Sequence, residues 1–542
     1  MYGAPLLGTA RDYDALYHSF RWDIPQHYNI GVDVCDRWAL SEPRRTAIFD
    51  VHADGTIDEI SYGRLREQSN RLANVLVAGG VNGGDRVAIL LPQGGAAAIS
   101  HIAVYKTGAI ALPLALLFGP DAIAYRLADS GVRAVITNAQ GVEKIIAPVG
   151  GAETSVSLVL SIDGPAHGAQ DFHAALARAS DDFTPAVSSS EDPALIMYTS
   201  GTTGPPKGAL HAHRVLLGHL PGVELPHEFL PQPGDRFWTP ADWAWAGGLL
   251  DVLLPSLHYG VPVVARRFEK FDPDEAFGLM ARLAVRNAFI PPTALRMLRA
   301  AKHPPTGVRL RSLGSGGEAL GLETFEWGKS ALGVSINEFY GQTECNLVVA
   351  SCAQIGLTQA GAMGKAVPGH AVGVVRPDGT RCKHGEVGEI AIRRPDPVMF
   401  LNYWGRDEAT QEKFVGDWML TGDQGMLDDR GYFYFVGRND DVITSAGYRI
   451  GPTEIEDCLI RHPAVALAAV VGKPDAMRTE IVKAFIVPKP GHDPSDALAA
   501  DIQGFVKARL SAHEYPREVA FLDEMPMTTT GKVIRRLLRE QA

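Results

Sequence analysis

The chain has 542 residues, of which 46% are hydrophobic and 21% are charged, so it is long enough for two or more globular domains. Its formal net charge of −11 at pH 7 argues against nucleic acid as the main partner, because phosphate binding needs a basic excess. The five cysteines are scattered, which argues against a disulfide framework and a zinc site. The N-terminus does not have the pattern of an export signal, and the apolar runs are too short to span a membrane. These features predict a cytoplasmic protein.

Short apolar runs alternate with amphipathic stretches through most of the chain. The runs typical of buried strands are 86–91, 133–137, 157–161 and 262–265, and the stretches with helical spacing include 62–78 and 274–285. This alternation predicts an α/β fold in which mostly parallel sheets are flanked by helices.

The pattern changes near residue 437. Beyond it the sequence predicts helices at 452–461 and 497–510 and strands at 465–471, 481–487 and 518–522. These elements form a compact α+β unit that is large enough to fold by itself. We therefore predict a large domain over residues 1–437 and a small C-terminal domain over residues 438–542.

The segment 198–208 carries the strongest functional signal. Glycines let the backbone approach an anion closely, and hydroxyl and amine groups supply donors; the residues concerned are Thr199, Ser200, Gly201, Thr202, Thr203, Gly204, Lys207 and Gly208. The segment is not a Walker A loop, because Lys207 is followed by Gly208 rather than by Ser or Thr. A polar turn is the alternative, but so many glycines and hydroxyls in one stretch favour a phosphate-binding loop.

This loop resembles the signature of the adenylate-forming enzymes, which include acyl-CoA synthetases, luciferases and the adenylation domains of peptide synthetases. The predicted arrangement of a large domain followed by a small one resembles the architecture of these enzymes over essentially the whole chain. Within the family, the chain most resembles the medium-chain acyl-CoA synthetases. The resemblance implies an acid–thiol ligase whose partners are ATP, CoA and a small carboxylic acid, with Mg²⁺ as cofactor. A homodimer stays open.

The resemblance also assigns residues to the nucleotide. Those expected at the adenine are Gly316, Gly317, Glu318, Glu338, Phe339, Tyr340, Gly341 and Gln342. Thr343 would contact the α-phosphate, and Glu344 together with Thr202 would hold Mg²⁺, which prefers oxygen ligands. Asp423 would accept hydrogen bonds from the ribose hydroxyls beside Arg438. Taken alone, these acidic segments are ordinary turns.

Further roles fall in the C-terminal domain. Lys532 matches the catalytic lysine of the family, which neutralises charge as pyrophosphate leaves. Asp440 falls at the hinge, so this domain is expected to be mobile and to rotate between the two half-reactions. The expected CoA contacts are Ala446, Gly447, Tyr448, Arg478, Lys507, Tyr515, Pro516 and Arg517. Glu514 departs from the family pattern, because a lysine is expected there.

The resemblance implies that Trp245, Gly341 and Arg449 contact the acyl substrate. Acetate-specific relatives carry Trp where this chain has Gly341, so we expect room for an acyl chain longer than acetyl. A short-branched or medium-chain fatty acid is the first choice, and an aryl acid of the benzoate type is the second.

Other functions of the same fold are weighed against this one. In peptide-synthetase adenylation domains an acidic pocket residue binds the substrate amine, whereas Asp242 here follows the acyl-CoA synthetase pattern. The motifs do not rule out luciferase-like oxygenation. A non-catalytic nucleotide-binding regulator would be expected to have lost Lys532, Glu344 or Asp423, and all three are present.

Overall fold

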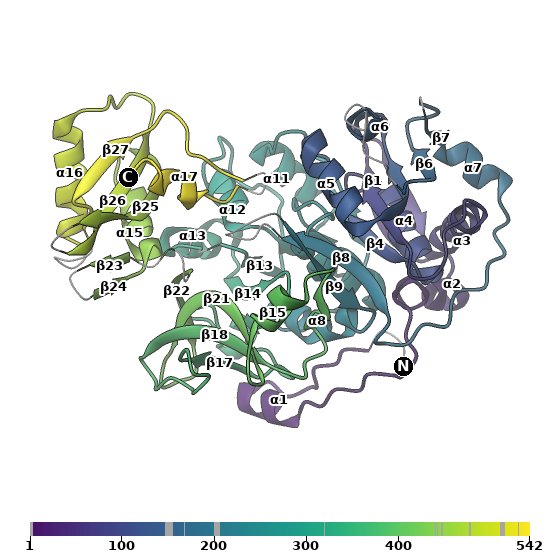
Figure 1. Ribbon diagram of the computed structural model, residues 1–542, viewed down its shortest axis with the longest axis horizontal. Coiled ribbons are helices and arrows are strands. Elements are labelled where there is room, and N and C mark those ends of the chain that lie inside the picture. Colours follow the sequence, from purple (N-terminus) through teal and green to yellow (C-terminus); the bar gives the residue numbers. More distant parts are fainter. Residues whose placement is uncertain are drawn as a thin grey trace. The chain divides into compact units, whose positions relative to one another are not determined.

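The computed structural model divides the chain into two compact units (Figure 1). The structure describes residues 4–146, 155–166, 168–199, 206–318, 320–438, 441, 443–445, 448–475, 478–509, 515–528 and 531–542. The first unit comprises Met1–Ala371 and Arg393–Asp417, and the second comprises Val372–Ile392 and Trp418–Ala542. This division by contacts places β17 and β18 with the C-terminal part, whereas the proposed functional boundary at 437/438 stays a prediction.

One sheet of the first unit has the strand order β19-β9-β8-β4-β3-β5-β6-β7. Its strands are β3 (Arg86–Leu90), β4 (Ile110–Pro113), β5 (Val132–Thr137), β6 (Leu158–Ser161), β7 (Gln170–Asp171), β8 (Pro193–Thr199), β9 (Lys207–Ala212) and β19 (Asn402–Tyr403). The pairings from β8 through β7 are parallel, while β9 runs antiparallel to β8 and to β19. The prediction of mostly parallel sheets is therefore confirmed.

The other sheet of this unit has the order β16-β15-β14-β13-β12-β10-β11-β1-β2. Its strands are β1 (Thr46–Val51), β2 (Ile57–Ser61), β10 (Phe237–Trp238), β11 (Val263–Ala265), β12 (Asn287–Phe289), β13 (Ser312–Gly316), β14 (Ile336–Gln342), β15 (Cys345–Ala350) and β16 (Lys365–Ala366). The pairings from β1 through β14 are parallel, as expected for strands that are buried on both faces.

Helices flank these two sheets. They are α1 (Tyr13–Ser19), α2 (Arg37–Ser41), α3 (Tyr62–Ala78), α4 (Gly95–Lys106), α5 (Pro120–Ser130), α6 (Ala139–Ile146), α7 (Phe172–Arg178), α8 (Val215–Glu224), α9 (Ala246–Gly248), α10 (Leu254–Tyr259), α11 (Pro273–Arg282), α12 (Pro292–Arg299), α13 (Leu322–Trp327) and α14 (Asp407–Gln411). The π-helices are η1 (Val32–Asp36), η2 (Leu249–Leu253) and η3 (Gly328–Leu332), the 3₁₀ helix is η4 (Ala353–Ile355), and β20 is Phe414–Val415.

Helix α3 illustrates how the sequence determines these elements. The hydroxyl of Ser61 accepts a hydrogen bond from the amide of Arg64 at 3.3 Å and so caps the first turn. Leu65, Leu72 and Leu76 recur at helical spacing and are fully buried, and the helix packs against α4 (Figure 1). No helix in the described part of the chain combines the length and the apolar character needed to cross a bilayer.

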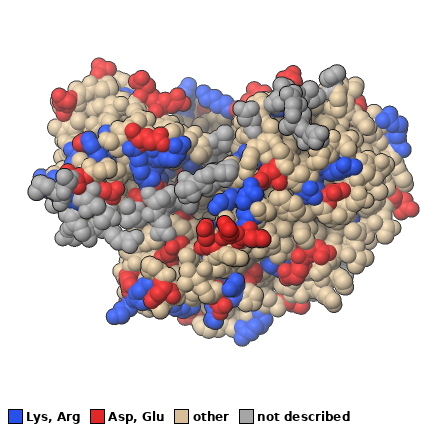
Figure 2. All heavy atoms as spheres, in the orientation of Figure 1, with Lys and Arg blue, Asp and Glu red and all other residues tan. Residues whose placement is uncertain are grey.

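The second unit contains two sheets. Strand β21 (Trp418–Leu427) lies between β18 (Val387–Arg393) and β22 (Phe433–Arg438), and β17 (Val372–Val375) pairs with β18. The other sheet contains β23 (Ile443–Ser445), β24 (Tyr448–Ile450), β25 (Val465–Asp475), β26 (Thr479–Pro488) and β27 (Glu518–Phe521), with helices α15 (Pro452–Ile460), α16 (Asp496–Lys507) and α17 (Arg535–Arg539). Basic and acidic side chains are interspersed on the face shown in Figure 2.

Candidate active site

The predicted phosphate loop connects two adjacent antiparallel strands. Thr199 at the end of β8 is the register partner of Lys207 at the start of β9, so both ends of the loop lie side by side. Lys207 is half-buried at this position. The other predicted loop residues, Ser200, Gly201, Thr202, Thr203 and Gly204, lie outside the described residues. The segment is thus a hairpin whose polar tip connects two strands of a largely parallel sheet.

The base of this hairpin is held by side chains from distant parts of the chain. Asp129 accepts hydrogen bonds from the hydroxyl of Tyr198 and from Arg406, both at 2.6 Å. The hydroxyl of Tyr125 donates to the carbonyl of Pro206 at 3.0 Å. These three contacts fix the strand ends on either side of the loop. Sequence reasoning missed Tyr125, Asp129 and Arg406, since none stands in the loop motif.

Glu344 lies in the turn between β14 and β15 and is only 5% exposed. The hydroxyl of Tyr403 donates a short hydrogen bond to its carboxylate, and its carbonyl accepts from the amide of Phe400 at 2.8 Å. Tyr403 is the register partner of Ala209 in β9. The Nζ of Lys207 lies 5.4 Å from the centre of the Tyr403 ring, within cation–π distance. Tyr403 therefore connects the predicted metal ligand with the predicted phosphate loop.

A buried histidine lies in the same strand as Lys207. His211 in β9 is 1% exposed, and burial lowers its pKa to about 3, partly opposed by the backbone of Thr343. The imidazole is therefore neutral at pH 7. Sequence reasoning did not single out His211, because a histidine in an apolar strand gives no signal of its own.

The two segments predicted to enclose the adenine are adjacent parallel strands. Gly316 of β13 is the register partner of Phe339 in β14. A Cβ on Gly316 would lie 2.6 Å from the Phe339 ring, so a glycine is needed for these strands to pack. Gly317 follows with φ +90°, Tyr340 is 8% exposed, and Glu318 forms an ion pair with Arg296 at 2.9 Å.

The end of β14 has a tight packing that the sequence did not reveal. A Cβ on Gly341 would lie 2.2 Å from the backbone nitrogen of Leu347 and 2.7 Å from the side-chain oxygen of Asn346. A side chain at position 341 would therefore collide with β15 before it reached an acyl pocket. Gln342, the next residue, accepts a hydrogen bond from Lys413 at 3.3 Å.

The predicted acyl-pocket segment combines core and accessible residues. Trp243 is 1% exposed and belongs to the core, whereas Trp245 is only partly buried. The Trp245 ring packs edge-on against Phe118, with ring centres 5.5 Å apart. Burial raises the pKa of Asp242 to about 6, although the amide of Ala244 donates to it at 3.0 Å. Because its indole is only partly buried, Trp245 is suited to form a wall of the acyl pocket.

The predicted ribose residues meet in the second unit. Asp423 in β21 and Arg438 in β22 are register partners in an antiparallel pair. Asp423 is 5% exposed, and its amide donates to the hydroxyl of Thr421 at 3.1 Å. The structure therefore brings together two residues that the sequence placed 15 positions apart.

Lys532 occupies a short, exposed turn of the same unit. Its amide donates to the Thr528 hydroxyl at 3.1 Å, and its carbonyl accepts from the Thr528 amide at 2.7 Å. Gly531, with φ +83°, permits this turn. The lysine side chain is exposed, which suits a group that has to reach a substrate.

The predicted CoA residues are described in part. Lys507 and Arg517 lie over the Tyr515 ring at 5.2 and 5.0 Å from its centre, next to the buried Pro516. The amide of Arg478 donates to Asp475 at 2.8 Å. The backbones of Tyr448 and Arg449 lie in β24, while Asp440, Ala446, Gly447 and Glu514 lie outside the described residues.

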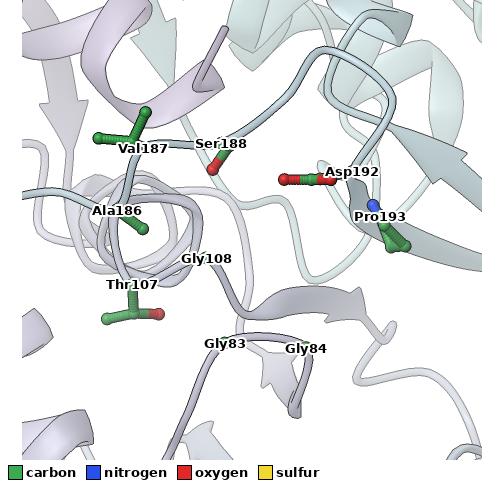
Figure 3. A pocket seen from close by; sticks show the side chains of 9 residues that line it. All are labelled: Gly83, Gly84, Thr107, Gly108, Ala186, Val187, Ser188, Asp192 and Pro193. Atoms are coloured by element: carbon green, nitrogen blue, oxygen red, sulfur yellow. The ribbon is translucent and has the colours of Figure 1, made fainter. Parts of the chain in front are cut away.

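A surface groove lies at the opposite edge of the β8 sheet (Figure 3). It is about 330 Å³ in volume and is lined by Gly83, Gly84, Thr107, Gly108, Ala186, Val187, Ser188, Asp192 and Pro193. These residues precede β3, β4 and β8, except for Pro193, which is the first residue of β8, so they lie at the amino ends of parallel strands. Ligands of such sheets bind at the carboxyl ends, which is where the phosphate loop lies. The groove contains no predicted site residue.

Comparison with known proteins places these features in a family context. The chain matches the family of AMP-binding enzymes over residues 35–404 and the AMP-binding enzyme C-terminal domain over residues 454–532. It is 33% identical to an acetyl-coenzyme A synthetase of Bacillus subtilis (strain 168), covering 98% of this chain and 95% of that protein. It is 34% identical to the mitochondrial acyl-coenzyme A synthetase ACSM4 of Mus musculus, covering 99% and 94%.

The fold agrees with a solved structure of the anthranilate CoA ligase AuaEII in complex with anthranoyl-AMP. The TM-score is 0.86 at 29% sequence identity, and the match covers 96% of this chain and 98% of the ligase chain.

Proposed function

The chain belongs to the family of AMP-binding enzymes and is an AMP-forming acid–CoA ligase, and from this premise we propose that its substrate is a short-branched or medium-chain fatty acid. The proposed reaction converts ATP, the acid and CoA into acyl-CoA, AMP and diphosphate through an acyl-adenylate. The observation that supports the activation of the acid by ATP is the position of Tyr403, which contacts both Lys207 and Glu344. The choice of a short-branched or medium-chain acid rests on the similarity to the acyl-coenzyme A synthetase ACSM4.

The acid needs no general base in the first step. A carboxylic acid with a pKa near ~4 is ionised at pH 7, so the obstacle is repulsion between its carboxylate and the phosphates of ATP. Lys207 and the amides of the phosphate loop would bind those phosphates, and the exposed Lys532 would neutralise the charge that develops on the leaving pyrophosphate.

The residues present fit a magnesium ion. The Glu344 carboxylate is buried, it is oriented by Tyr403, and carboxylate oxygens are hard ligands. Glu344 would hold the ion, with Thr202 as the second predicted ligand. Bound there, the ion would supply positive charge beside the phosphate oxygens. The part that Tyr403 would play is to orient one carboxylate oxygen and leave the other available.

The second half-reaction requires a change of conformation in this proposal. We propose that residues 438–542 rotate about Asp440, which withdraws Lys532 and brings Gly447 toward the thiol of CoA. The cation–aromatic cluster of Lys507, Tyr515 and Arg517 would then bind the anionic nucleotide part of CoA. A coenzyme thiol has a pKa near ~8.5, and a few per cent of it is ionised at pH 7.

An aryl acid is the second candidate, favoured by the aromatic residues near the predicted pocket. Trp245 packs on Phe118, and the rings of Phe289 and Phe339 lie 5.2 Å apart. The similar anthranilate CoA ligase structure supports this alternative as well. The space available at Gly341 gives no support to either acid class, because β15 fills it.

One assay with a panel of acids tests the proposal. We expect ATP–pyrophosphate exchange to depend on Mg²⁺ and on a branched or straight acid of about four to ten carbons, and acyl-CoA and AMP to accumulate in equal amounts when CoA is added. Exchange with benzoates alone would establish the aryl alternative. No exchange with any carboxylic acid would contradict the proposed function.

A further inference from the structure

A buried polar pair joins η2 to β15. Asp251 in η2 is 2% exposed, and Asn346 in β15 is 8% exposed. The side-chain amide of Asn346 donates to Oδ1 of Asp251 at 2.5 Å across 95 residues of sequence. The flanking residues of η2, including Leu249, Leu250, Val252 and Leu253, are all apolar and buried. A carboxyl group inside such an element calls for an explanation.

The pair lies between the two segments that the sequence assigned to the acyl substrate. A Cβ on Gly247, two residues after Trp245, would lie 3.7 Å from Oδ2 of Asp251 and 2.7 Å from the Phe289 ring. A Cβ on Gly341 would lie 2.7 Å from Oδ1 of Asn346. Asp251 and Asn346 therefore connect the segment around Trp245 with the strand that leads to Glu344.

The environment of this carboxyl group favours its uncharged form. Burial raises the pKa of Asp251 well above its usual value, and the hydrogen bond from Asn346 opposes only part of that rise. With Oδ1 accepting from Asn346, the proton of the neutral acid belongs on Oδ2. In its neutral form Asp251 is a hydrogen-bond donor as well as an acceptor.

The pair has unused hydrogen-bonding capacity. Within the described residues, Oδ2 of Asp251 and Oδ1 of Asn346 make no hydrogen bond, and neither belongs to the fully buried atoms that lack a partner, so both oxygens are accessible from outside the pair. A single hydroxyl can satisfy both, because it accepts from the Asp251 acid and donates to the Asn346 carbonyl. A charged ammonium group would instead need an ionised carboxylate, which this buried position disfavours.

The backbone beside the pair is unusual. Leu347, the residue after Asn346, has φ +62°, a conformation that non-glycine residues rarely adopt. The backbone nitrogen of this residue is the atom nearest to the missing Cβ of Gly341, at 2.2 Å. The strained residue and the glycine together fix the place of the Asn346 amide.

We propose that Asp251 and Asn346 form a polar subsite of the acyl pocket and that the acid used by this enzyme carries a hydroxyl group which binds there. The inference rests on the proposed function and narrows its substrate class from a plain hydrocarbon acid to a hydroxy acid. The competing explanation is a purely structural tie between η2 and β15.

Matched pairs of acids test the subsite in the wild-type enzyme. Butanoate, hexanoate and benzoate are each compared with their monohydroxy derivatives by kcat/KM for acid-dependent pyrophosphate exchange. We expect at least one derivative to exceed its parent by about 10²-fold, because a bound parent acid leaves both polar groups without a partner, at ~1–3 kcal/mol each. If every parent acid matched or exceeded all of its derivatives, the subsite would be overturned.

Variants separate recognition from packing. Asp251→Leu with Asn346→Leu replaces both polar groups by apolar groups of similar size, so we expect the preference to reverse toward the parent acid while exchange continues. Asp251→Asn keeps a donor and an acceptor and should retain the hydroxy preference to within about tenfold of the wild type. Ser100→Ala removes a buried hydroxyl that bonds only within α4 and serves as the control.

The outcomes distinguish this inference from the proposed function. An unchanged ratio of hydroxy acid to parent in a folded double variant, with only the melting temperature altered, would leave Asp251 and Asn346 a structural tie and overturn the subsite. If no carboxylic acid supported pyrophosphate exchange, the proposed function and the subsite would both be overturned. If the double variant does not fold, the wild-type ratios and Asp251→Asn decide the question.

Discussion

Two charged groups of the candidate site have opposite surroundings. Glu344 is 5% exposed and is held by the side chain of Tyr403 and by the backbone of Phe400. Lys532 is exposed, and the hydrogen bonds described for it join its backbone to Thr528 in its own turn. The first group belongs to the unit built on the large sheets, and the second belongs to the other unit.

This difference agrees with the two tasks that the reaction sets. A metal ligand must keep its geometry within a fraction of an ångström, which requires supporting contacts that lock its rotamer. A lysine that acts in one half-reaction and is withdrawn in the other must be able to leave, so supporting contacts would hinder it. Substitutions at Lys532 are accordingly expected to change chemistry without changing stability.

The largest expected effect is that of Lys532→Ala. Loss of one preorganised charge should lower acyl-adenylate formation by about 10²–10³-fold, while thioester formation from a supplied acyl-adenylate should stay within a few-fold of the wild type. Single-turnover assays of the two half-reactions and a melting curve measure this. Lys489→Ala, at another exposed lysine of the same unit, is the control. Equal loss of both half-reactions would contradict the proposal that Lys532 acts in the first half-reaction only and is withdrawn in the second.

Tyr403→Phe tests the fixed side of the comparison. Removing the hydroxyl that orients Glu344 should weaken magnesium binding by about 10–100-fold, the usual range for groups that support a metal ligand. The Mg²⁺ concentration for half-maximal pyrophosphate exchange should rise accordingly, at a fixed ATP concentration. Tyr17→Phe removes a hydroxyl bonded to the carbonyl of His370 and should leave the Mg²⁺ dependence unchanged. An unchanged Mg²⁺ dependence in Tyr403→Phe would remove Tyr403 from the site.

Gly341→Ala tests whether close packing against β15 requires a glycine at position 341. The added methyl group meets the backbone of Leu347 at 2.2 Å, so unfolding in urea should show a loss of about 2 kcal/mol. Activity should fall alike for acetate and for hexanoate. Gly504→Ala in α16, where nothing lies within 4 Å, should raise stability slightly. A shift from hexanoate toward acetate would show instead that Gly341 lines the acyl pocket.

The smallest effect is expected for Tyr125→Phe. This variant removes the hydrogen bond to the carbonyl of Pro206, one typical bond of ~1 kcal/mol, and should raise the KM for ATP about fivefold with kcat nearly unchanged. Initial rates over a range of ATP concentrations measure this. A loss in kcat with an unchanged KM for ATP would contradict this expectation, because the Tyr125 hydroxyl would then affect catalysis rather than ATP binding.

Much of the fold follows from the sequence because parallel strands are buried on both faces. Runs such as 86–91 and 133–137 are nearly continuous in apolar residues, and both are strands of the β8 sheet. The helix predicted at 62–78 has the bounds of α3. The position of β17 and β18 could not be predicted, because contact with a later segment of the chain, rather than local pattern, assigns them to the second unit.

The site was predictable where a motif is local and was not where contacts are long-range. Asp423 and Arg438 and the two adenine segments lie together because neighbouring strands pair. The hydrogen bond between Tyr403 and Glu344 spans 59 residues, and no local pattern marks it. Asp251 was missed for the same reason, since a single acid within an apolar run gives no signal and its partner Asn346 lies 95 residues away.

A two-stage single-turnover experiment tests the central claim most directly. Enzyme in excess over the acid that supports the fastest pyrophosphate exchange is mixed with ATP and Mg²⁺ without CoA, quenched, and assayed for acyl-adenylate; CoA is then added to a parallel sample. The account predicts one acyl-adenylate and one pyrophosphate per acid in the first stage, and conversion of that adenylate to acyl-CoA and AMP in the second. Release of ADP and phosphate, or an adenylate that CoA does not consume, would contradict it.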